Sequence, residues 1–171
     1  MDAARTVVLG IGNVLWADEG FGIRAVEALQ ARGTLPEGVE AVDGGTQGLY
    51  LLPLVTEASR LLILDAVDFG EQPGTLLVLR GDEVPRLMGA KRLSLHQTTF
   101  QDVLAAAELM GDAPTEIALV GVQAGTLDDF GAGLTPQVAE AIPAALAEVD
   151  RLLAEWGFAA RPLSAMITKE K

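Results

Sequence analysis

Three side chains of this 171-residue sequence could together bind a transition metal, although they lie far apart along the chain. Glu19 and Asp65 are carboxylates, and His96 is the only histidine, so any imidazole ligand or neutral-pH acid–base group must be His96. Two carboxylates and one imidazole suit zinc or nickel and leave coordination positions open for water or substrate. Each residue also has a simpler explanation, since a local hydrogen bond accounts for a loop histidine and an Asx turn accounts for Asp65. The sequence therefore predicts a metal site only if the fold brings the three together.

Residues 10–22, GIGNVLWADEGFG, begin like a nucleotide-binding glycine turn and continue with two acids. A dinucleotide fingerprint needs three glycines, and only the first two, Gly10 and Gly12, are present. Asp18 and Glu19 would repel a pyrophosphate at a helix N-terminus, where the helix dipole normally favours anions. The sequence therefore disfavours a dinucleotide site. It predicts that Asp18 caps the following helix, and it leaves Glu19 either complementing the helix dipole or acting in a site.

Other hydrolytic arrangements are excluded or disfavoured by the residues present. Cysteine is absent, which excludes disulfides, thiolate metal sites and a cysteine nucleophile. A single histidine excludes the H-E-x-x-H motif, and no serine lies in a G-x-S-x-G elbow. Ser94 lies two residues before His96, but that spacing on an extended segment does not by itself bring the side chains into contact. A serine hydrolase is therefore disfavoured.

The charge and hydropathy pattern limits the partners and the location. Twelve Lys+Arg and 24 Asp+Glu give a net charge of −12, and no basic stripe is present, so nucleic acid is an improbable partner. The N-terminal apolar run is too short for a signal peptide, and no apolar stretch is long enough to cross a bilayer. We therefore expect a cytoplasmic protein without membrane insertion. Its length suits one domain over residues 1–171.

Apolar stretches that alternate with helical patterns predict the fold. Three of the five predicted strands are continuous apolar runs, which are typical of parallel strands covered on both faces. The predicted strands are 6–10, 39–43, 60–67, 74–80 and 116–122. Helices are expected from Phe21 through Leu29 and beyond, near 49–57, at about 99–110 with Gly111 as the stop, and from Val138 to Trp156. Thr135 and Pro136 suit the start of the last helix, and Pro143 predicts a kink or a restart within it.

This alternation predicts a three-layer α/β/α domain with a mostly parallel, five-stranded twisted sheet. We expect a phosphorylase/hydrolase-like fold whose strands begin in the flavodoxin-like order 2–1–3. Glu19 then follows the first strand and Asp65 follows four aliphatic residues of the third, so the two acids face each other across a crevice. His96 precedes a helix that Thr99 can cap, in a segment able to fold back over that crevice. The glycines of residues 43–48, DGGTQG, could expose backbone groups to a bound peptide or form a tight turn.

Six stretches of the sequence, taken in order, resemble the hydrogenase maturation endopeptidases. The resemblance runs from about Val7 to Trp156, which is nearly the whole chain. The form LWADEGFG together with SLHQ is similar to the branch that processes uptake, membrane-bound nickel–iron hydrogenases. The six stretches are GIGNVLWADEGFGIRAVEAL, VDGGTQGL, LLILDAVD, PGTLLVLRGDEVP, SLHQTTFQDVLA and ALVGVQ.

The resemblance implies an endopeptidase that removes the C-terminal extension of a hydrogenase large-subunit precursor after nickel insertion. It implies that Glu19, Asp65 and His96 are both the catalytic and the metal-binding residues. The nickel is carried by the precursor, which is the expected partner, and another divalent ion can replace it in the free enzyme. The family is grouped by some with aspartic-type peptidases, so water is activated either by a carboxylate as general base or by the metal as Lewis acid. The tail after about residue 157 lies beyond the resemblance and is expected to be peripheral.

Two other functions remain open from the sequence. A non-catalytic module or chaperone would check the nickel of the precursor while another protein cuts. A nucleotide-binding oxidoreductase is supported only by the strand–GxG–helix opening. A generic metallopeptidase is disfavoured, because we expect no cleavage of unrelated peptides.

Overall fold

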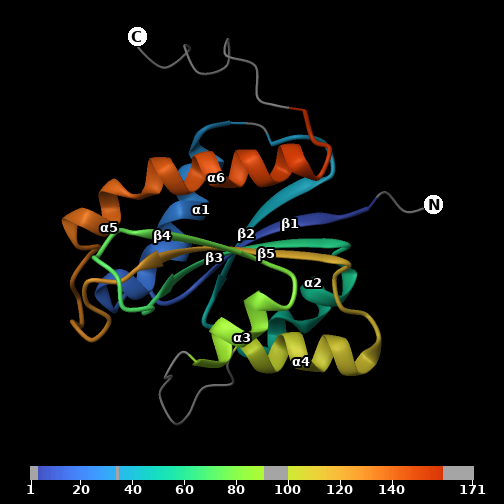
Figure 1. Cartoon of the computed structure of the whole chain (residues 1–171), viewed down its shortest axis with the longest axis horizontal. Helices are drawn as coiled ribbons and strands as arrows, with labels where there is room; N and C mark the ends of the chain where they lie inside the picture. Colours follow the sequence, from blue (N-terminus) through green and yellow to red (C-terminus); the bar gives the residue numbers. More distant parts are fainter. Residues whose placement is uncertain (1–3, 34, 91–99, 160–171) are drawn as a thin grey trace.

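A five-stranded sheet with strands in the order β2–β1–β3–β5–β4 forms the centre of the computed structural model, which describes residues 4–33, 35–90 and 100–159 (Figure 1). Strands β1, β2, β3 and β5 pair in parallel, and β4 is antiparallel to β5 at one edge. The mostly parallel sheet and the opening order 2–1–3 predicted from the sequence are confirmed. The strands are β1 (Thr6–Ile11), β2 (Val39–Gly45), β3 (Arg60–Val67), β4 (Leu76–Arg80) and β5 (Glu116–Gln123).

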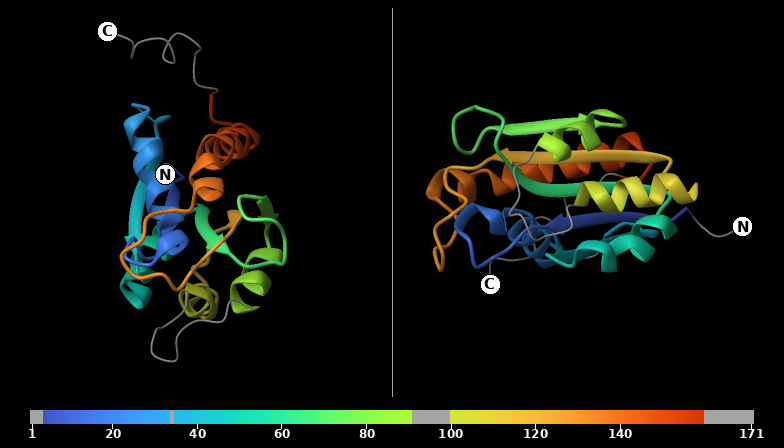
Figure 2. Two further views of the ribbon diagram at one scale, coloured as in Figure 1. Left: turned by 90° about the vertical axis from the view of Figure 1, so that its left-hand side faces the viewer. Right: turned by 90° about the horizontal axis from the view of Figure 1, so that it is seen from below.

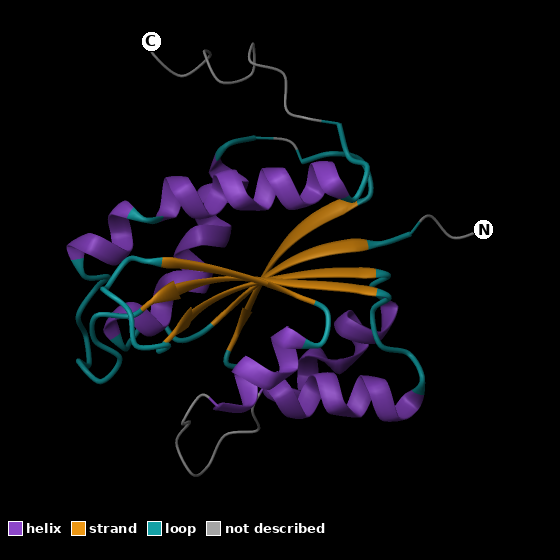
Figure 3. Cartoon of the chain, viewed as in Figure 1, coloured by secondary structure: helices purple, strands orange, loops and turns teal. Residues whose placement is uncertain are grey.

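Helices cover both faces of the sheet, which confirms the three-layer arrangement (Figure 3). One face carries α1 (Phe21–Ala31), α5 (Pro136–Glu140) and α6 (Ile142–Glu155). The opposite face carries α2 (Leu52–Glu57), α3 (Glu83–Ala90) and α4 (Phe100–Met110). Two short 3₁₀ helices, η1 (Ala17–Gly20) and η2 (Gly48–Leu51), follow β1 and β2. Within the described part of the chain, every helix is too short or too polar to span a membrane.

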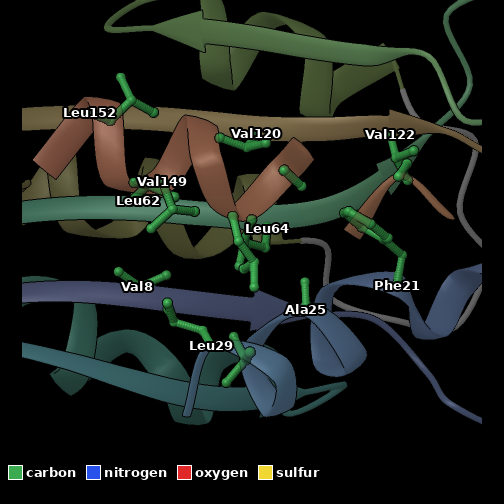
Figure 4. Packing of buried hydrophobic residues seen from close by; sticks show 14 of the residues in the cluster. Val8, Phe21, Ala25, Leu29, Leu62, Leu64, Val120, Val122, Val149 and Leu152 are labelled. Carbon is green, nitrogen blue, oxygen red and sulfur yellow. The ribbon is translucent and has the colours of Figure 1, made fainter. Parts of the chain in front are cut away.

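The apolar strands supply two core layers because side chains alternate between the faces of a sheet. In β3, Leu62 and Leu64 pack toward α1 and α6, whereas Leu61 and Ile63 pack toward α2 and α4. All four are fully buried. Figure 4 shows the first layer, in which Leu62 and Leu64 lie beneath Val149 of α6. Burying one such side chain stabilises the fold by roughly 1.5–3 kcal/mol, so β3 is held firmly between the two helical layers.

Pro143 divides the last predicted helix into two. α5 ends at Glu140 and α6 starts again at Ile142, with Pro143 in the first turn, where a missing backbone N–H removes no helical hydrogen bond. The restart predicted from the sequence is therefore confirmed.

Some element boundaries differ from the sequence prediction, since β1, β2 and β5 end one or two residues later than expected. The strand predicted to start at residue 74 starts at Leu76. The structure also contains α3, which the sequence pattern did not predict, because this eight-residue helix includes Pro85 and Gly89. Pro85 lies in the first turn of α3, where proline is tolerated. The predicted stop of α4 is confirmed, since Gly111 follows the helix with a φ of +79°.

Candidate active site

Glu19 and Asp65 lie at the same edge of the sheet. The parallel strands β1, β2, β3 and β5 all end there, and we call this the carboxyl edge (left panel of Figure 2). Glu19 lies in η1, directly after β1, and η1 contacts β3. The pairing of β1 with β3 ends at Gly10 and Leu64, so Asp65 is the first residue of β3 beyond that ladder. The fold thus brings together the segments that carry the two predicted carboxylates.

Two glycines allow η1 and α1 to sit directly on the sheet. A Cβ atom at Gly22 would lie 2.3 Å from the carbonyl oxygen of Leu64 and 2.4 Å from that of Ile11. A Cβ atom at Gly12 would lie 1.9 Å from the carbonyl oxygen of Glu19. Gly12 also has a φ of +137°, which L-residues rarely adopt. Because the protein's own backbone fills this space, the G-x-G turn serves the packing of η1 and not the approach of a nucleotide phosphate.

Asp65 is a buried carboxylate, with 1% of its surface exposed. The sequence left an Asx turn open for it, but β3 continues to Val67, so Asp65 lies within a strand and not in a turn. Ile63, two residues earlier, packs toward α2 and α4, and strand alternation directs Asp65 to the same side. In the pairing of β3 with β5, Asp65 lies opposite Gly121, and glycine has no side chain that could cover the carboxylate. A carboxylate removed from water requires polar partners or a cation.

His96 lies outside the described residues, so its predicted role stays a prediction. The helices that flank it in the sequence, α3 and α4, both cover the face toward which Asp65 points. Thr99, the predicted cap of α4, also lies outside the described residues, and α4 begins at Phe100. In the ranges that the structure describes, no group of three or more His, Cys, Asp or Glu side chains could hold a metal ion. The predicted set needs His96, which is not among those residues.

Asp18 does not cap α1, and this prediction from the sequence is wrong. Its carboxylate is fully buried and accepts backbone hydrogen bonds from Gly125 (2.8 Å), Thr126 (3.0 Å) and Thr135 (2.7 Å). The Thr135 hydroxyl donates to the same carboxylate at 2.9 Å. Thr135 is the N-cap residue of α5, as predicted, but its hydroxyl binds Asp18 and not the helix. These partners are more than 100 residues from Asp18, so local spacing gave no signal of the contact.

Asp18 joins two loops, residues 13–20 and 124–135, which we call the clamped loops. Backbone contacts join them as well, since the N–H of Ala17 donates to the carbonyl of Ala132 at 3.1 Å. Ala17 has a φ of +46°, an uncommon conformation for a residue with a Cβ atom. The surrounding contacts maintain this strained residue two positions before Glu19. Hydrogen bonds from residues 124–135 to Asp18, and from Ala17 to Ala132, therefore hold the turn that carries Glu19.

The DGGTQG segment, residues 43–48, forms a turn at the end of β2. The carboxylate of Asp43 accepts a hydrogen bond from the N–H of Gly45 at 2.9 Å. The carbonyl of Gly44 accepts another from the N–H of Gln47 at 3.3 Å. These backbone groups are used within the protein, which favours the tight-turn explanation over a peptide-binding one.

A surface pocket of about 530 Å³ lies away from the carboxyl edge. Arg80, Glu116 and Trp156 are among its lining residues, and they place it where β4 ends and β5 begins. The pocket therefore lies at the opposite edge of the sheet from Glu19 and Asp65 and is not part of the candidate site.

Comparison with known proteins identifies the family. The family model described as hydrogenase maturation protease matches residues 23–151, which is more than half of the chain. The chain belongs to the hydrogenase maturation protease family. The hydrogenase expression/formation protein HupD of Rhodobacter capsulatus is 57% identical over 153 residues, which cover 90% of this chain and 73% of that protein. The hydrogenase 2 maturation protease of Escherichia coli is 43% identical, with 95% of this chain and 98% of that protein covered.

Solved structures of this family have the same fold. The hydrogenase maturating endopeptidase HybD from E. coli superimposes with a TM-score of 0.85 at 43% identity, covering 94% of this chain and 98% of that chain. A hydrogenase 2 maturation peptidase from a Thaumarchaeota archaeon gives a TM-score of 0.66 at 30% identity, covering 87% and 97%. Family membership supports peptidase activity, and it confirms the resemblance and the α/β fold expected from the sequence.

Proposed function

We propose that this protein is an endopeptidase that removes the C-terminal extension of a nickel–iron hydrogenase large-subunit precursor after nickel insertion. One observation carries the proposal. In a chain of the hydrogenase maturation protease family, the turn with Glu19 is seated on the end of the strand that carries Asp65. Glu19, Asp65 and His96 then meet the nickel ion that the precursor presents. The metal is part of the substrate, so it reports that the precursor is ready to be cut.

The charge of the carboxyl edge supports recognition of a cation. The segments that follow β1, β3 and β5 contain acidic residues but no Lys or Arg, so they produce a negative local potential. Carboxylate and imidazole groups are suitable ligands for nickel, and an incomplete protein ligand set leaves the precursor's own ligands in place. These three segments are residues 12–20, 68–75 and 124–135.

Positioning is the main chemical contribution that we assign to the site. Holding the nickel at Glu19 and Asp65 places the nearby scissile bond beside the same groups, and such proximity supplies a large part of many rate accelerations. Water is activated in one of two ways, by the substrate's nickel as Lewis acid or by a carboxylate as general base. The second route corresponds to the aspartic-type grouping that the family resemblance implied.

The test is to incubate the purified protein with its precursor, with and without nickel, and to weigh the products by mass spectrometry. We expect a shortened large subunit and a released C-terminal peptide only from the nickel-loaded precursor. A stable complex without a shortened product would instead identify a non-catalytic nickel-checking module. Cleavage of the nickel-free precursor or of unrelated peptides would contradict nickel recognition.

A nucleotide-binding oxidoreductase is disfavoured, because the backbone of Glu19 fills the space at Gly12 that a phosphate would need. Measurable binding of NAD or flavin would reverse this judgement. The cytoplasmic location expected from the sequence stays a prediction.

A further inference from the structure

Two exposed aromatic side chains lie on the clamped loops, beside the candidate site. Trp16 is 38% exposed and Phe130 is 67% exposed. Their rings meet edge to face with centroids 5.1 Å apart, and their backbones form an antiparallel bridge. Leu15 and Val14 are exposed next to them, and the Leu15 carbonyl accepts a hydrogen bond from Gly131 at 2.7 Å. We call Val14, Leu15, Trp16 and Phe130 the apolar platform.

The apolar platform is held in place by the contacts beneath it. The buried Asp18 carboxylate ties the loop of Trp16 to the loop of Phe130. A surface that is already ordered loses less conformational entropy when a partner binds than a mobile loop does. The Trp16 carbonyl also accepts a hydrogen bond from the N–H of Glu19 at 3.0 Å. A polypeptide that docks on the platform is therefore held next to Glu19.

The charge around the apolar platform indicates which partner fits. Asp128 and Asp129 are exposed directly before Phe130, and neither clamped loop contains Lys or Arg. Aromatic rings attract cations, tryptophan most strongly, and aromatic side chains are frequent anchors of protein interfaces. An apolar and acidic surface complements a segment with apolar side chains and Lys or Arg, and it repels an acidic segment.

We propose that the apolar platform is the docking surface for a segment of the hydrogenase large-subunit precursor in which apolar side chains lie beside Lys or Arg. The inference rests on the proposed function, because it takes the precursor as the occupant. Docking there would hold the scissile bond near Glu19 and Asp65 and add affinity that the nickel contacts alone do not provide. A second copy of this chain is disfavoured as the occupant, because two acidic platforms on molecules of net charge −12 repel each other.

The test compares Trp16→Ser and Phe130→Ser with Leu109→Ser in steady-state processing of the nickel-loaded precursor. Leu109 is 91% exposed on α4, on the other side of the sheet, and is a matched apolar control. We expect each platform variant to raise KM about tenfold while kcat stays within about twofold, which is the size of a typical interface anchor. The conservative variant Trp16→Phe should recover most of the affinity, and Leu109→Ser should behave as wild type.

Measuring the affinity of wild type and the platform variants for the nickel-loaded precursor, separately from cleavage, distinguishes a failure of this inference from a failure of the proposed function. If wild type binds but does not cleave, the proposed function fails, and weaker binding by Phe130→Ser still supports the docking surface. If wild type cleaves and both platform variants bind and cleave as wild type does, the docking surface is wrong and the function stands.

The double variant Asp128→Lys/Asp129→Lys should also raise KM. A wild-type dimer that the platform variants dissociate, with KM unchanged, would make the platform a self-association surface and overturn the inference.

Discussion

The two edges of the sheet use charge in opposite ways. At the edge where the parallel strands begin, which we call the amino edge, acids lie beside arginines. Arg5 forms ion pairs with Glu40 and Glu57, and Arg60 forms one with Glu116 at 3.3 Å. At the carboxyl edge, the segments that follow β1, β3 and β5 carry acids and contain no Lys or Arg. Arginines therefore offset part of the acidic charge at the amino edge, whereas the carboxyl edge keeps a negative field for a cationic or cation-bearing partner.

The two edges also differ in how their polar groups are held. Ion pairs near the surface, such as the partly exposed ones of the amino edge, usually contribute little to stability. The carboxyl edge instead contains a fully buried carboxylate, Asp18, and glycine contacts that tolerate no additional atom. Replacing Asp18, or adding a Cβ atom at these glycines, is therefore expected to lower the stability of the fold. The amino edge therefore carries surface ion pairs, whereas the carboxyl edge holds a turn in one position.

Gly22→Ala should cause the largest loss of stability. The new Cβ atom would lie 2.3 and 2.4 Å from two backbone carbonyl oxygens, which cannot move away without shifting α1 from the sheet. We expect a loss of about 3 kcal/mol in the free energy of unfolding, measured by urea denaturation. The matched control is Gly133→Ala in the same region, where a Cβ atom meets nothing within 4 Å. A Gly22→Ala protein as stable as this control would contradict the seating of α1 on β1 and β3.

Asp18→Ala should come next, with a loss of about 2 kcal/mol, because three backbone N–H groups and one hydroxyl lose their acceptor. Asp18→Asn keeps one acceptor oxygen and should fall between Asp18→Ala and wild type. Glu116→Gln at the amino edge is the control and should cost no more than about 0.5 kcal/mol. The comparison between the edges fails if Asp18→Ala and Glu116→Gln shift the urea midpoint equally.

Glu155→Gln should have the smallest effect. Arg80, at the end of β4, donates a hydrogen bond to Glu155 at 2.9 Å, and this bond lowers the pKa of the carboxyl below its ordinary 4.5. Arg151 lowers the pKa further. Because the folded pKa lies below the unfolded one, the carboxylate stabilises the protein above about pH 4.5, and this stabilisation disappears as the pH falls through the folded pKa. We expect Glu155→Gln to lower Tm by no more than about 1 °C at pH 7.

Thermal melts of wild type and Glu155→Gln from pH 7 down to about pH 3 check that sign. The difference in Tm should shrink below the ordinary pKa. A difference that is constant over this range, or that grows toward acid, would show that the ion pairs are not its source.

The sequence predicts the layers and the place of Asp65 because these depend on local patterns. Four aliphatic residues directly before Asp65 define a buried strand, and a parallel strand delivers the residue after them to the carboxyl edge. The role of Asp18 was not predictable in this way, since Thr135 lies 117 residues away and both residues are also common helix caps. The sequence did not predict α3. A proline such as Pro85 usually interrupts a helix, and only the structure shows that it lies in the first turn, where it is tolerated.

We propose that Glu19, Asp65 and His96 act together on the nickel of a precursor. The most direct test is the rate at which Glu19→Gln and His96→Ala process the nickel-loaded precursor, with Glu116→Gln at the amino edge as the control. We expect a fall of about 100-fold or more for the two site variants, as is typical when an acid–base or metal-binding group is lost, and an unchanged rate for the control. Wild-type rates for Glu19→Gln and His96→Ala would contradict the site.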